Sequence, residues 1–519
     1  MAAVGGRLRA RFPALSSVSL SLSALAALSS EEARELAAGL GACGSTLTSF
    51  SLHNGGSGKY YPTSFCCCYS CACDLAHDLR ITHPSTMALR LTTLLSSTPG
   101  LATLDLRGLA DLVGPSRYCD CDLQPQGGFV EVFHVYSLLG GFTRLRSLRL
   151  ACDCRGSGLG LLAASVDALA PSLRHLSITA AAPDDDEEED SDMEEDDLSL
   201  DEGETAFLGR LTSLEALELK GCRCPSLPAW LASLTRLTRL EADGCCLRFE
   251  EDAAALAGLP RLRELSLQAF APAEGLVPVA GVTRLTCETS WKEREMLLAA
   301  FPGLIEADLQ MFALGPAAVP APTVPLGEHL RRLTVRVRLP LAGAIPNSAV
   351  HGRVLEQLRQ LLLGLPALRQ LNVPAHGTIG CAELPPLLHA SPALEELALS
   401  GDLSTLDASA FDGCPRYPSL RALSLDDDGG GSEEPKKPPP QQALAGLTSA
   451  GLLALGRAFP GLARLSLGPG IPAERRRDWW EGLRRGIAAT GFCSDASLLV
   501  AVRRVLRREA ARLAQEATP

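Results

Sequence analysis

The sequence predicts an α/β solenoid, a curved horseshoe with a parallel β-sheet on its concave face and helices outside. Three observations support this fold class. A leucine pattern recurs along most of the chain, its copies lie mostly 20 to 28 residues apart, and apolar segments with helical spacing lie between copies. One strand and one helix cannot enclose a core alone, so neighbouring units must stack and share one.

The clearest copies lie between residues 211 and 267. Each copy begins with an apolar anchor. After two further residues come two apolar positions that are separated by one residue, and this alternation predicts a short strand with one apolar face. The three copies are Leu214/Leu217/Leu219, Leu237/Leu240/Ala242 and Leu262/Leu265/Leu267. A cysteine stands three residues after the first two copies, at Cys222 and Cys245, and we expect it to point inward at the turn.

The anchor position can be followed along the chain from residue 15 to residue 462. The anchors are Leu15, Leu47, Leu101, Leu145, Leu173, Leu214, Leu237, Leu262, Val282, Leu304, Leu330, Leu368, Leu394, Leu420 and Leu462. Wider gaps coincide with segments rich in Gly, Pro, Cys or charge, which we interpret as insertions at about residues 54–74, 114–128, 183–204, 313–327 and 426–442. We expect the gap between Leu47 and Leu101 to hide a further, degenerate repeat.

The two ends of the chain differ in character. The first thirty residues contain three arginines, many serines and no acid, as a transit peptide does, but Leu15, Val18 and Leu20 fit the repeat, which is the interpretation we favour. The solenoid is thus predicted over residues 1–470. Residues 471–519 have a helical composition and are predicted to be a C-terminal helical cap; a basic amphipathic helix that binds a membrane or a partner is the alternative. No apolar run is long enough to span a membrane.

The segment 447–467 resembles the cysteine-containing subclass of leucine-rich repeats, which is related to ribonuclease-inhibitor-like proteins. The positions that match are Thr448, Gly451, Leu452, Leu455, Pro460, Leu462, Leu465 and Leu467. The resemblance implies a non-enzymatic protein-interaction module. It also suggests two alternatives: the substrate-receptor subunit of a ubiquitin ligase, although no F-box precedes Leu15, and an axonemal or cytoskeletal scaffold. The fold alone does not choose among these roles.

The cysteines are the densest chemical feature of the sequence. Cys66, Cys67, Cys68, Cys71 and Cys73 lie close together, and Cys68-x-x-Cys71 has the spacing of metal ligands. No second pair of that kind follows, so we expect a thiol-rich loop without metal. Most of the 18 cysteines are adjacent or alternate, which indicates reduced thiols in the cytoplasm, with the nucleus, the cilium axoneme or an organelle as alternatives.

No arrangement of a nucleophile and a base, phosphate-binding loop or cofactor motif occurs, so we expect no enzymatic activity and no cofactor. A sustained basic surface with aromatic residues, which nucleic-acid binding would need, is also missing. The remaining candidate is the concave face, to which the strand positions between the leucines project, and we expect a monomer that binds a protein there. Ordinary solvated surface is the alternative. The candidate binding residues are Arg146, Arg149, Glu218, Glu241, Asp308, Arg332, Arg336 and Asn372.

An acidic tract lies between the anchors Leu173 and Leu214. Residues 184–204 contain fifteen acidic residues and no basic one, although the net charge of the whole chain is only −12. Such a tract offers little apolar surface, so we expect a disordered loop that either is merely solvated or attracts a basic protein partner. The arginines of the C-terminal segment are an intramolecular alternative. Ser191 and Ser199 each precede a glutamate by three residues and are candidate sites for an acid-directed kinase.

Deleting residues 184–202 tests these interpretations of the tract. Because mutual repulsion keeps the acids solvated, we expect the melting temperature of the solenoid to change little. Partner binding should weaken most at low salt, where charge attraction is least screened. Calorimetry and a binding titration at two salt concentrations measure both effects. Unfolding of the deletion variant would show instead that the tract is structural.

Overall fold

In the computed structural model the chain divides into two compact units. Unit 1 is Met1–Ala269 with Ala273–Val277, and unit 2 is Phe270–Pro272 with Pro278–Pro519. The structure describes residues 10–53, 84–109, 134–152, 159–180, 202–222, 227–247, 250–270, 278–290, 293–312, 327–338, 347–374, 384–400, 416–426 and 458–467. The predicted insertions, apart from their last or first residues, and the predicted cap at 471–519 lie outside this part of the chain.

Unit 1 contains strands β1 to β8, which follow one another in the sheet in chain order. The strands from β1 to β7 pair in parallel. Their bounds are β1 Ser17–Ser21, β2 Ser49–His53, β3 Thr103–Asp105, β4 Ser147–Cys152, β5 His175–Ala180, β6 Ala216–Lys220, β7 Arg239–Leu247 and β8 Glu264–Phe270. Parallel strands need a crossover between them, and helices fill this role.

The helices of unit 1 are short, and several are 3-10 helices, labelled η. They are α2 Leu22–Ala27, α3 Ser30–Ala42, α4 Pro84–Ser96, η2 Arg107–Leu109, η3 His134–Gly141, α7 Leu159–Leu162, η4 Ala163–Ser165, α8 Val166–Leu169, α9 Glu202–Thr205, η7 Ala206–Arg210, η8 Ala229–Ser233 and α10 Glu250–Ala257. The segment 227–234 has helical spacing in the sequence, and its helix is the 3-10 helix η8.

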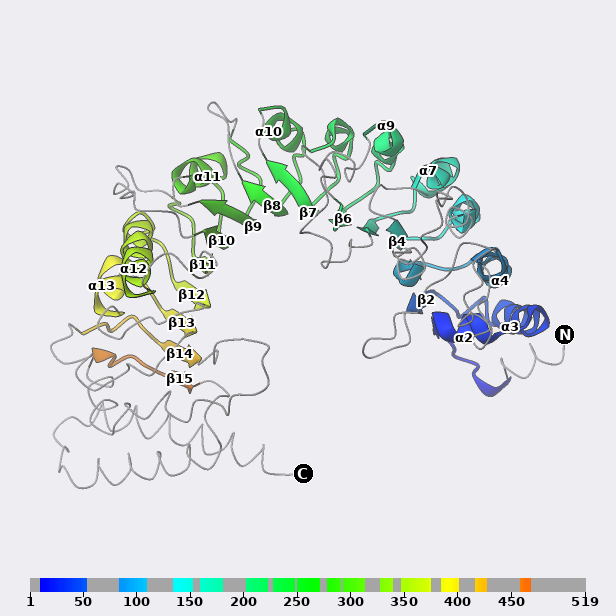
Figure 1. Cartoon of the computed structure of the whole chain (residues 1–519), viewed down its shortest axis with the longest axis horizontal. Coiled ribbons are helices and arrows are strands. Elements are labelled where there is room, and N and C mark those ends of the chain that lie inside the picture. The colour runs from blue at the N-terminus through cyan, green and yellow to red at the C-terminus, as the bar shows by residue number, and fades with distance from the viewer. Residues whose placement is uncertain are drawn as a thin grey trace, which may run out of the picture. The chain divides into compact units, whose positions relative to one another are not determined.

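Unit 2 repeats the same plan with strands β9 to β15, which pair in parallel in chain order. The strands are β9 Arg284–Ser290, β10 Glu306–Phe312, β11 Arg332–Arg338, β12 Gln370–Pro374, β13 Glu396–Ser400, β14 Ala422–Asp426 and β15 Arg464–Leu467. Its described helices are α11 Arg294–Ala300, α12 Asn347–Leu363 and α13 Leu384–Ala390. In each unit the labelled helices lie on one side of the strands (Figure 1).

The register of the strands places equivalent leucines next to one another. Leu217 of β6 is opposite Leu176 of β5 and Leu240 of β7. The anchors from Leu47 to Leu462 are all buried, as the repeat predicts. Leu15 is only half-buried, because β1 has a neighbouring strand on one side alone in the sheet order. The predicted fold class, an α/β leucine-rich-repeat solenoid, is therefore confirmed.

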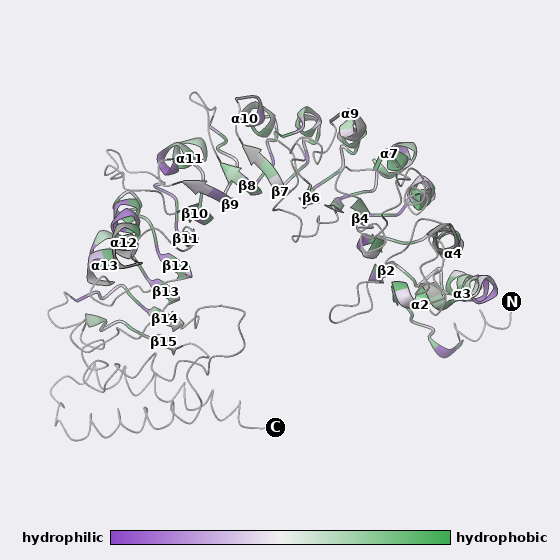
Figure 2. Ribbon diagram, viewed as in Figure 1, coloured by the Kyte–Doolittle hydropathy of each residue, from purple (hydrophilic) through white to green (hydrophobic). Residues whose placement is uncertain are grey.

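Helix α3 shows how the sequence determines where a repeat helix begins and which face it buries. Ser29 and Glu32 form a capping box: the Ser29 backbone N–H donates to Glu32 Oε2 at 2.7 Å, and the Glu32 N–H donates to Ser29 Oγ at 3.2 Å. Ala37 and Leu40 then face the core. Helices α3 and α12 carry both hydrophilic and hydrophobic residues, as expected for helices with one buried face (Figure 2).

The cysteines after the strands lie in the core. Cys222 and Cys245 are fully buried free thiols, which confirms the expectation that they point inward. The Cys222 thiol donates to the carbonyl oxygen of Lys220 at 3.7 Å, so it satisfies a backbone group at the turn.

No further strand lies between β2 and β3 in the sheet. Strand β2 pairs directly with β3, with Phe50 opposite Leu104, so the prediction of a degenerate repeat there was wrong. Helix α4 lies in the described part of the segment between these strands, and residues 54–83 lie outside the described ranges. A single repeat can carry such an insertion because it contacts only its neighbours.

A Pro-Gly-Leu turn leads into two strands of unit 2. A Cβ on Gly303 would overlap the carbonyl oxygen of Ala280, and one on Gly461 would overlap that of Pro418. These turns therefore need glycine because the backbone of the preceding repeat passes very close.

Replacing Leu265 with Asp tests the shared core. Leu265 is 2% exposed, so the variant would bury an unpaired charge, and we expect a loss of roughly several kcal/mol in the free energy of unfolding. Gln268→Asp is the matched control, because Gln268 lies on the same strand and is exposed. Urea denaturation of both variants measures the difference. Equal stabilities would contradict the assignment of strand faces.

Candidate functional site

The side of each strand that faces away from the helices is the candidate binding surface, which we call the open strand face. In β6 and β8, buried leucines alternate with partly exposed residues. Residues two apart on a strand point to the same side, so both the position before the first strand leucine and the position between the leucines contribute to this face. No described helix covers it (Figure 1).

In unit 1 the open strand face holds a network of four charged side chains on β6 and β7. Glu241 contacts Lys220 at 3.0 Å and Arg239 at 2.7 Å. Glu218 lies farther from the same two cations, at 3.8 Å and 3.6 Å. Opposite charges on neighbouring strands stabilise a sheet in this way. The predicted residues Glu218 and Glu241 are therefore brought together.

The charge state of Glu241 follows from this network. Burial raises the pKa of its carboxyl, but the hydrogen bonds from Lys220 and Arg239 outweigh burial, and the pKa lies below its usual value. The pKa of Asp243 is shifted the opposite way, because burial and the nearby Glu241 both disfavour its ionised form. The four charged side chains of the network thus pair largely with one another.

The candidate binding residues Arg146 and Arg149 have different surroundings. Arg149 contacts Asp105 at 3.4 Å, and Arg107 contacts the same carboxylate at 2.7 Å. Arg146 is exposed and lies before the strand, and none of the described residues forms an ion pair with it. A hollow of about 630 Å³ beside these groups is lined by Arg149, Ser177, Glu218 and Arg239, among others.

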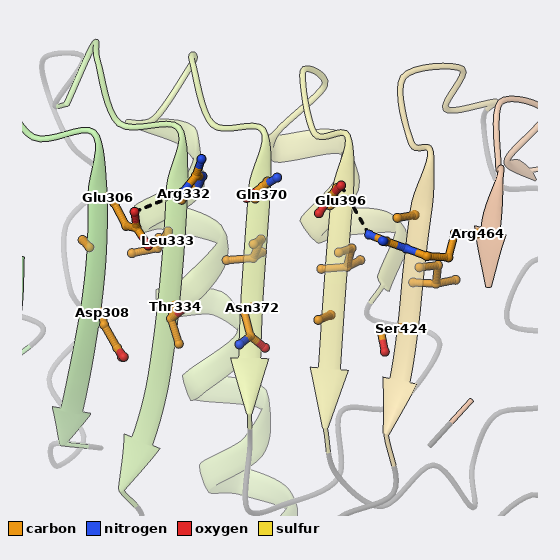
Figure 3. Close-up of a pocket in the computed structure, with 16 residues that line it drawn as sticks. Glu306, Asp308, Arg332, Leu333, Thr334, Gln370, Asn372, Glu396, Ser424 and Arg464 are labelled. Atoms are coloured by element: carbon orange, nitrogen blue, oxygen red, sulfur yellow. Dashed lines mark hydrogen bonds and ion pairs between the residues drawn. The ribbon is translucent and has the colours of Figure 1, made fainter. Parts of the chain in front are cut away.

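In unit 2 a hollow of about 330 Å³ lies over strands β10 to β15 (Figure 3). Ion pairs lie at its two ends: Arg332 with Glu306 at 3.2 Å, and Arg464 with Glu396 at 3.3 Å. Between them lie uncharged positions. These positions are Thr334, Gln370, Asn372, Ala398, Ala422 and Ser424.

The structure brings three predicted residues, Asp308, Arg332 and Asn372, to the wall of this hollow. Arg336 lies beside it and contacts Asp308 at 2.7 Å. Burial raises the pKa of Asp308 more than Arg336 lowers it, and Glu306 adds to the increase. Sequence reasoning missed Glu306, Gln370, Glu396 and Arg464 as site residues. Their signal was their place immediately before the first apolar position of the strand, which shares a face with the position between the two apolar residues.

Other predicted sites lie outside the described part of the chain, namely the cysteines from Cys66 to Cys73 and the serines Ser191 and Ser199. Within the described ranges, no group of three His, Cys, Asp or Glu residues could hold a metal ion. Cys287 on β9 is a buried free thiol, and burial raises its pKa. None of the helices in the described ranges is long and apolar enough to cross a membrane.

Replacing Glu241 with Gln tests the unit 1 network. Because the folded-state pKa of Glu241 is lowered, ionisation stabilises the fold above its unfolded pKa, and this stability is lost as the pH falls through the folded-state value. We expect a loss of about 1 kcal/mol at pH 7, allowing for partial solvent screening. The deficit should shrink below about pH 4.5, near the usual pKa of a glutamate. Urea denaturation against pH measures it.

Glu218→Gln is the control for this prediction, because Glu218 contacts the same cations at longer distances. It should cost less stability at pH 7. An equal loss in both variants would show that the close contacts of Glu241 contribute nothing specific.

Comparison with known proteins gives structural similarity at low sequence identity. Neither the known protein families nor the curated proteins match the sequence. Among solved structures, a leucine-rich-repeat protein of Leptospira interrogans is 15% identical, with 63% of this chain and 79% of that chain covered and a TM-score of 0.27. An internalin of Listeria monocytogenes is 14% identical, with 57% and 76% covered and a TM-score of 0.29.

A chain in the crystal structure of the mouse RP105/MD-1 complex is 13% identical, with 73% of this chain and 60% of that chain covered and a TM-score of 0.25. Similarity at this level does not carry a function from one protein to another. The repeated leucine pattern, the parallel strands in chain order and the buried anchors are the features that establish the fold. The chain is a leucine-rich-repeat protein in fold.

Proposed function

We propose that the protein is a non-enzymatic interaction module and that a protein partner binds to the open strand face of unit 2. The observation that carries this proposal is the floor of the 330 Å³ hollow. Thr334, Gln370 and Asn372 lie there, and in the described structure no side chain or backbone group forms a hydrogen bond with these three side chains. Hydroxyl and amide groups without a protein partner are available to a ligand.

The backbone fixes these side chains in rows. Thr334, Asn372, Ala398 and Ser424 are opposite one another in successive strands. A second row is formed by Arg332, Gln370, Glu396 and Ala422. Side chains on a hydrogen-bonded sheet are held in place before a partner arrives, which reduces the entropy lost on binding.

The small side chains favour a protein partner. Ala398, Ala422 and Ser424 leave room above the strands, so that the main chain of a partner can approach. The amides of Gln370 and Asn372 each offer a donor and an acceptor, which is what peptide groups require. In unit 1, by contrast, Glu218 and Glu241 are already paired with Lys220 and Arg239.

The charged groups of the face suit binding better than catalysis. Its carboxylates pair with arginines, as Glu306 does with Arg332 and Glu396 with Arg464. Arginine stays protonated at physiological pH and does not transfer protons. Two further roles, a ubiquitin-ligase substrate receptor and an axonemal scaffold, would use the same face, and the identity of the bound proteins distinguishes them.

Replacing Asn372 with Tyr tests the proposal. Asn372 is exposed, so we expect the free energy of unfolding to change by no more than about 0.5 kcal/mol while the bulky ring fills the hollow. Affinity purification with mass spectrometry should then lose the partners that the unchanged protein retains. Leu363→Tyr is the control, because Leu363 is 49% exposed on α12, on the helix side of the same unit.

Equal sets of partners for the two variants would show that the face is not the binding surface. Recovery of ubiquitin-ligase adaptor subunits, lost in neither variant, would favour the ligase alternative.

A further inference from the structure

One row of unit 2 lies immediately before the strands and carries arginines. The backbone of this row is continuous: the N–H of Arg331 donates to Ile305 O at 2.8 Å, that of Arg369 to Arg331 O at 2.9 Å, and that of Glu395 to Arg369 O at 2.7 Å. The Arg421 N–H donates to Glu395 O at 2.7 Å. The side chains of Arg331, Arg369 and Arg421 are exposed. Parallel strands therefore place these side chains along one edge of the sheet.

The carboxylates at this edge already form ion pairs with arginines other than Arg331 and Arg421. Glu395 contacts Arg369 at 2.9 Å. Glu306 is paired with both Arg332 and Arg284, and Glu396 is paired with Arg464. Arg331 and Arg421 are left without an ion pair or a side-chain hydrogen bond among the residues that the structure describes. We call this edge the arginine rim, and its arginines outnumber its glutamates. Its residues are Arg284, Arg331, Arg332, Arg369, Arg421, Arg464, Glu306, Glu395 and Glu396.

The two unpaired arginines have a defined separation. Arg331 precedes β11 and Arg421 precedes β14, three strands away in the sheet order. Neighbouring strands lie about 4.8 Å apart, so the two positions are about 14 Å apart. An extended peptide rises about 3.3 Å per residue and points alternate side chains to opposite sides. Two residues four apart in such a peptide are thus about 13 Å apart and point the same way.

We propose that the unit 2 face binds an acidic segment of a partner protein, extended across the strands, with two carboxylates four residues apart on Arg331 and Arg421. This inference rests on the proposed function and names the chemistry of the partner. An arginine binds a carboxylate through two parallel N–H donors, which gives direction as well as attraction. Ile305, which is 43% exposed one strand from Arg331, offers an apolar contact at one end of the segment.

The floor of the hollow favours a protein over a nucleic acid as the source of the negative charge. Proteins that hold single-stranded nucleic acids stack the bases on aromatic side chains. The residues that line this hollow include no aromatic one. Gln370 and Asn372 instead present amides next to the rim, where the main chain of an extended segment would pass (Figure 3).

The test uses the full chain as bait for a random peptide library displayed on phage, at low salt. Peptides with two acidic residues at positions i and i+4 should be enriched over those with other spacings. Anisotropy titrations of a labelled, enriched peptide should show about tenfold weaker binding to the double variant Arg331→Gln, Arg421→Gln, since each exposed ion pair contributes modestly. Added salt should weaken binding to the unchanged protein.

The matched control is the double variant Arg359→Gln, Arg416→Gln, which removes the same charge from unit 2. Arg359 lies on α12, and Arg416 lies in the segment before β14; neither belongs to the row of backbone positions that contains Arg331, Arg369 and Arg421. This variant should bind the peptide as the unchanged protein does. Thermal melting of the rim variant should match that of the unchanged protein, because Arg331 and Arg421 are exposed. The control variant also loses the ion pair of Arg359 with Glu356 at 2.7 Å, so its melting temperature should fall slightly.

Four outcomes would overturn the inference. Enriched peptides without paired acids, or no enriched peptide at all, would show that the rim does not select carboxylates; so would equal binding to both double variants. If such peptides still lose binding to the Asn372→Tyr variant, the proposed function stands and only the acidic partner is wrong. An oligouridine probe that binds more tightly than the peptides, and loses affinity in the rim variant, would assign the face to nucleic acid.

Discussion

The burial of equivalent leucines between neighbouring repeats is the interaction on which the structure depends. A strand such as β6 buries Leu217 and Leu219 completely, yet neither its own residues nor those of one helix could exclude water from them. The next repeat must supply the other side of the core. This requirement holds successive strands in parallel and in the same register, as the pairing of Leu217 with Leu176 and Leu240 shows.

The same register organises the polar side chains, although they contribute little to stability themselves. Because leucines align with leucines, the positions between them align too, and charges from separate repeats come within reach of one another. Most of these ion pairs are partly exposed, and each contributes at most about 1 kcal/mol. These pairs neutralise carboxylates such as Glu306 and Glu396, whereas Arg331 and Arg421 have no ion pair among the described residues.

Much of the fold could be predicted because the leucine pattern states both which residues are buried and where a repeat begins. The anchors from Leu47 onward confirm this. The error in the gap before Leu101 arose because sequence spacing cannot distinguish a degenerate repeat from a long connection; only the direct pairing of β2 with β3 does. The 3-10 form of η8 also escaped prediction, since helical spacing of apolar residues is compatible with either type of short helix.

The candidate site was less predictable than the fold. The position between the leucines identified Asp308 and Asn372, but Gln370 and Glu396 occupy the preceding position, which faces the same way. Whether an ion pair forms depends on which charged residue lies opposite in the neighbouring repeat. That residue can be identified from the sequence only when the register of the strands is known. Arg149 illustrates the point, because its partner Asp105 lies in the preceding repeat, 44 residues earlier in the chain.

The buried thiols have a consequence for studying how the protein opens. Cys43, Cys152, Cys222, Cys245 and Cys287 are distributed over different repeats and are all shielded from solvent as free thiols. In a stack where each repeat contacts only its neighbours, parts of the chain can open separately. An alkylating reagent, with the modified cysteines located by peptide mapping, would therefore record which repeats open first. These five cysteines can therefore serve as chemical reporters for several different repeats.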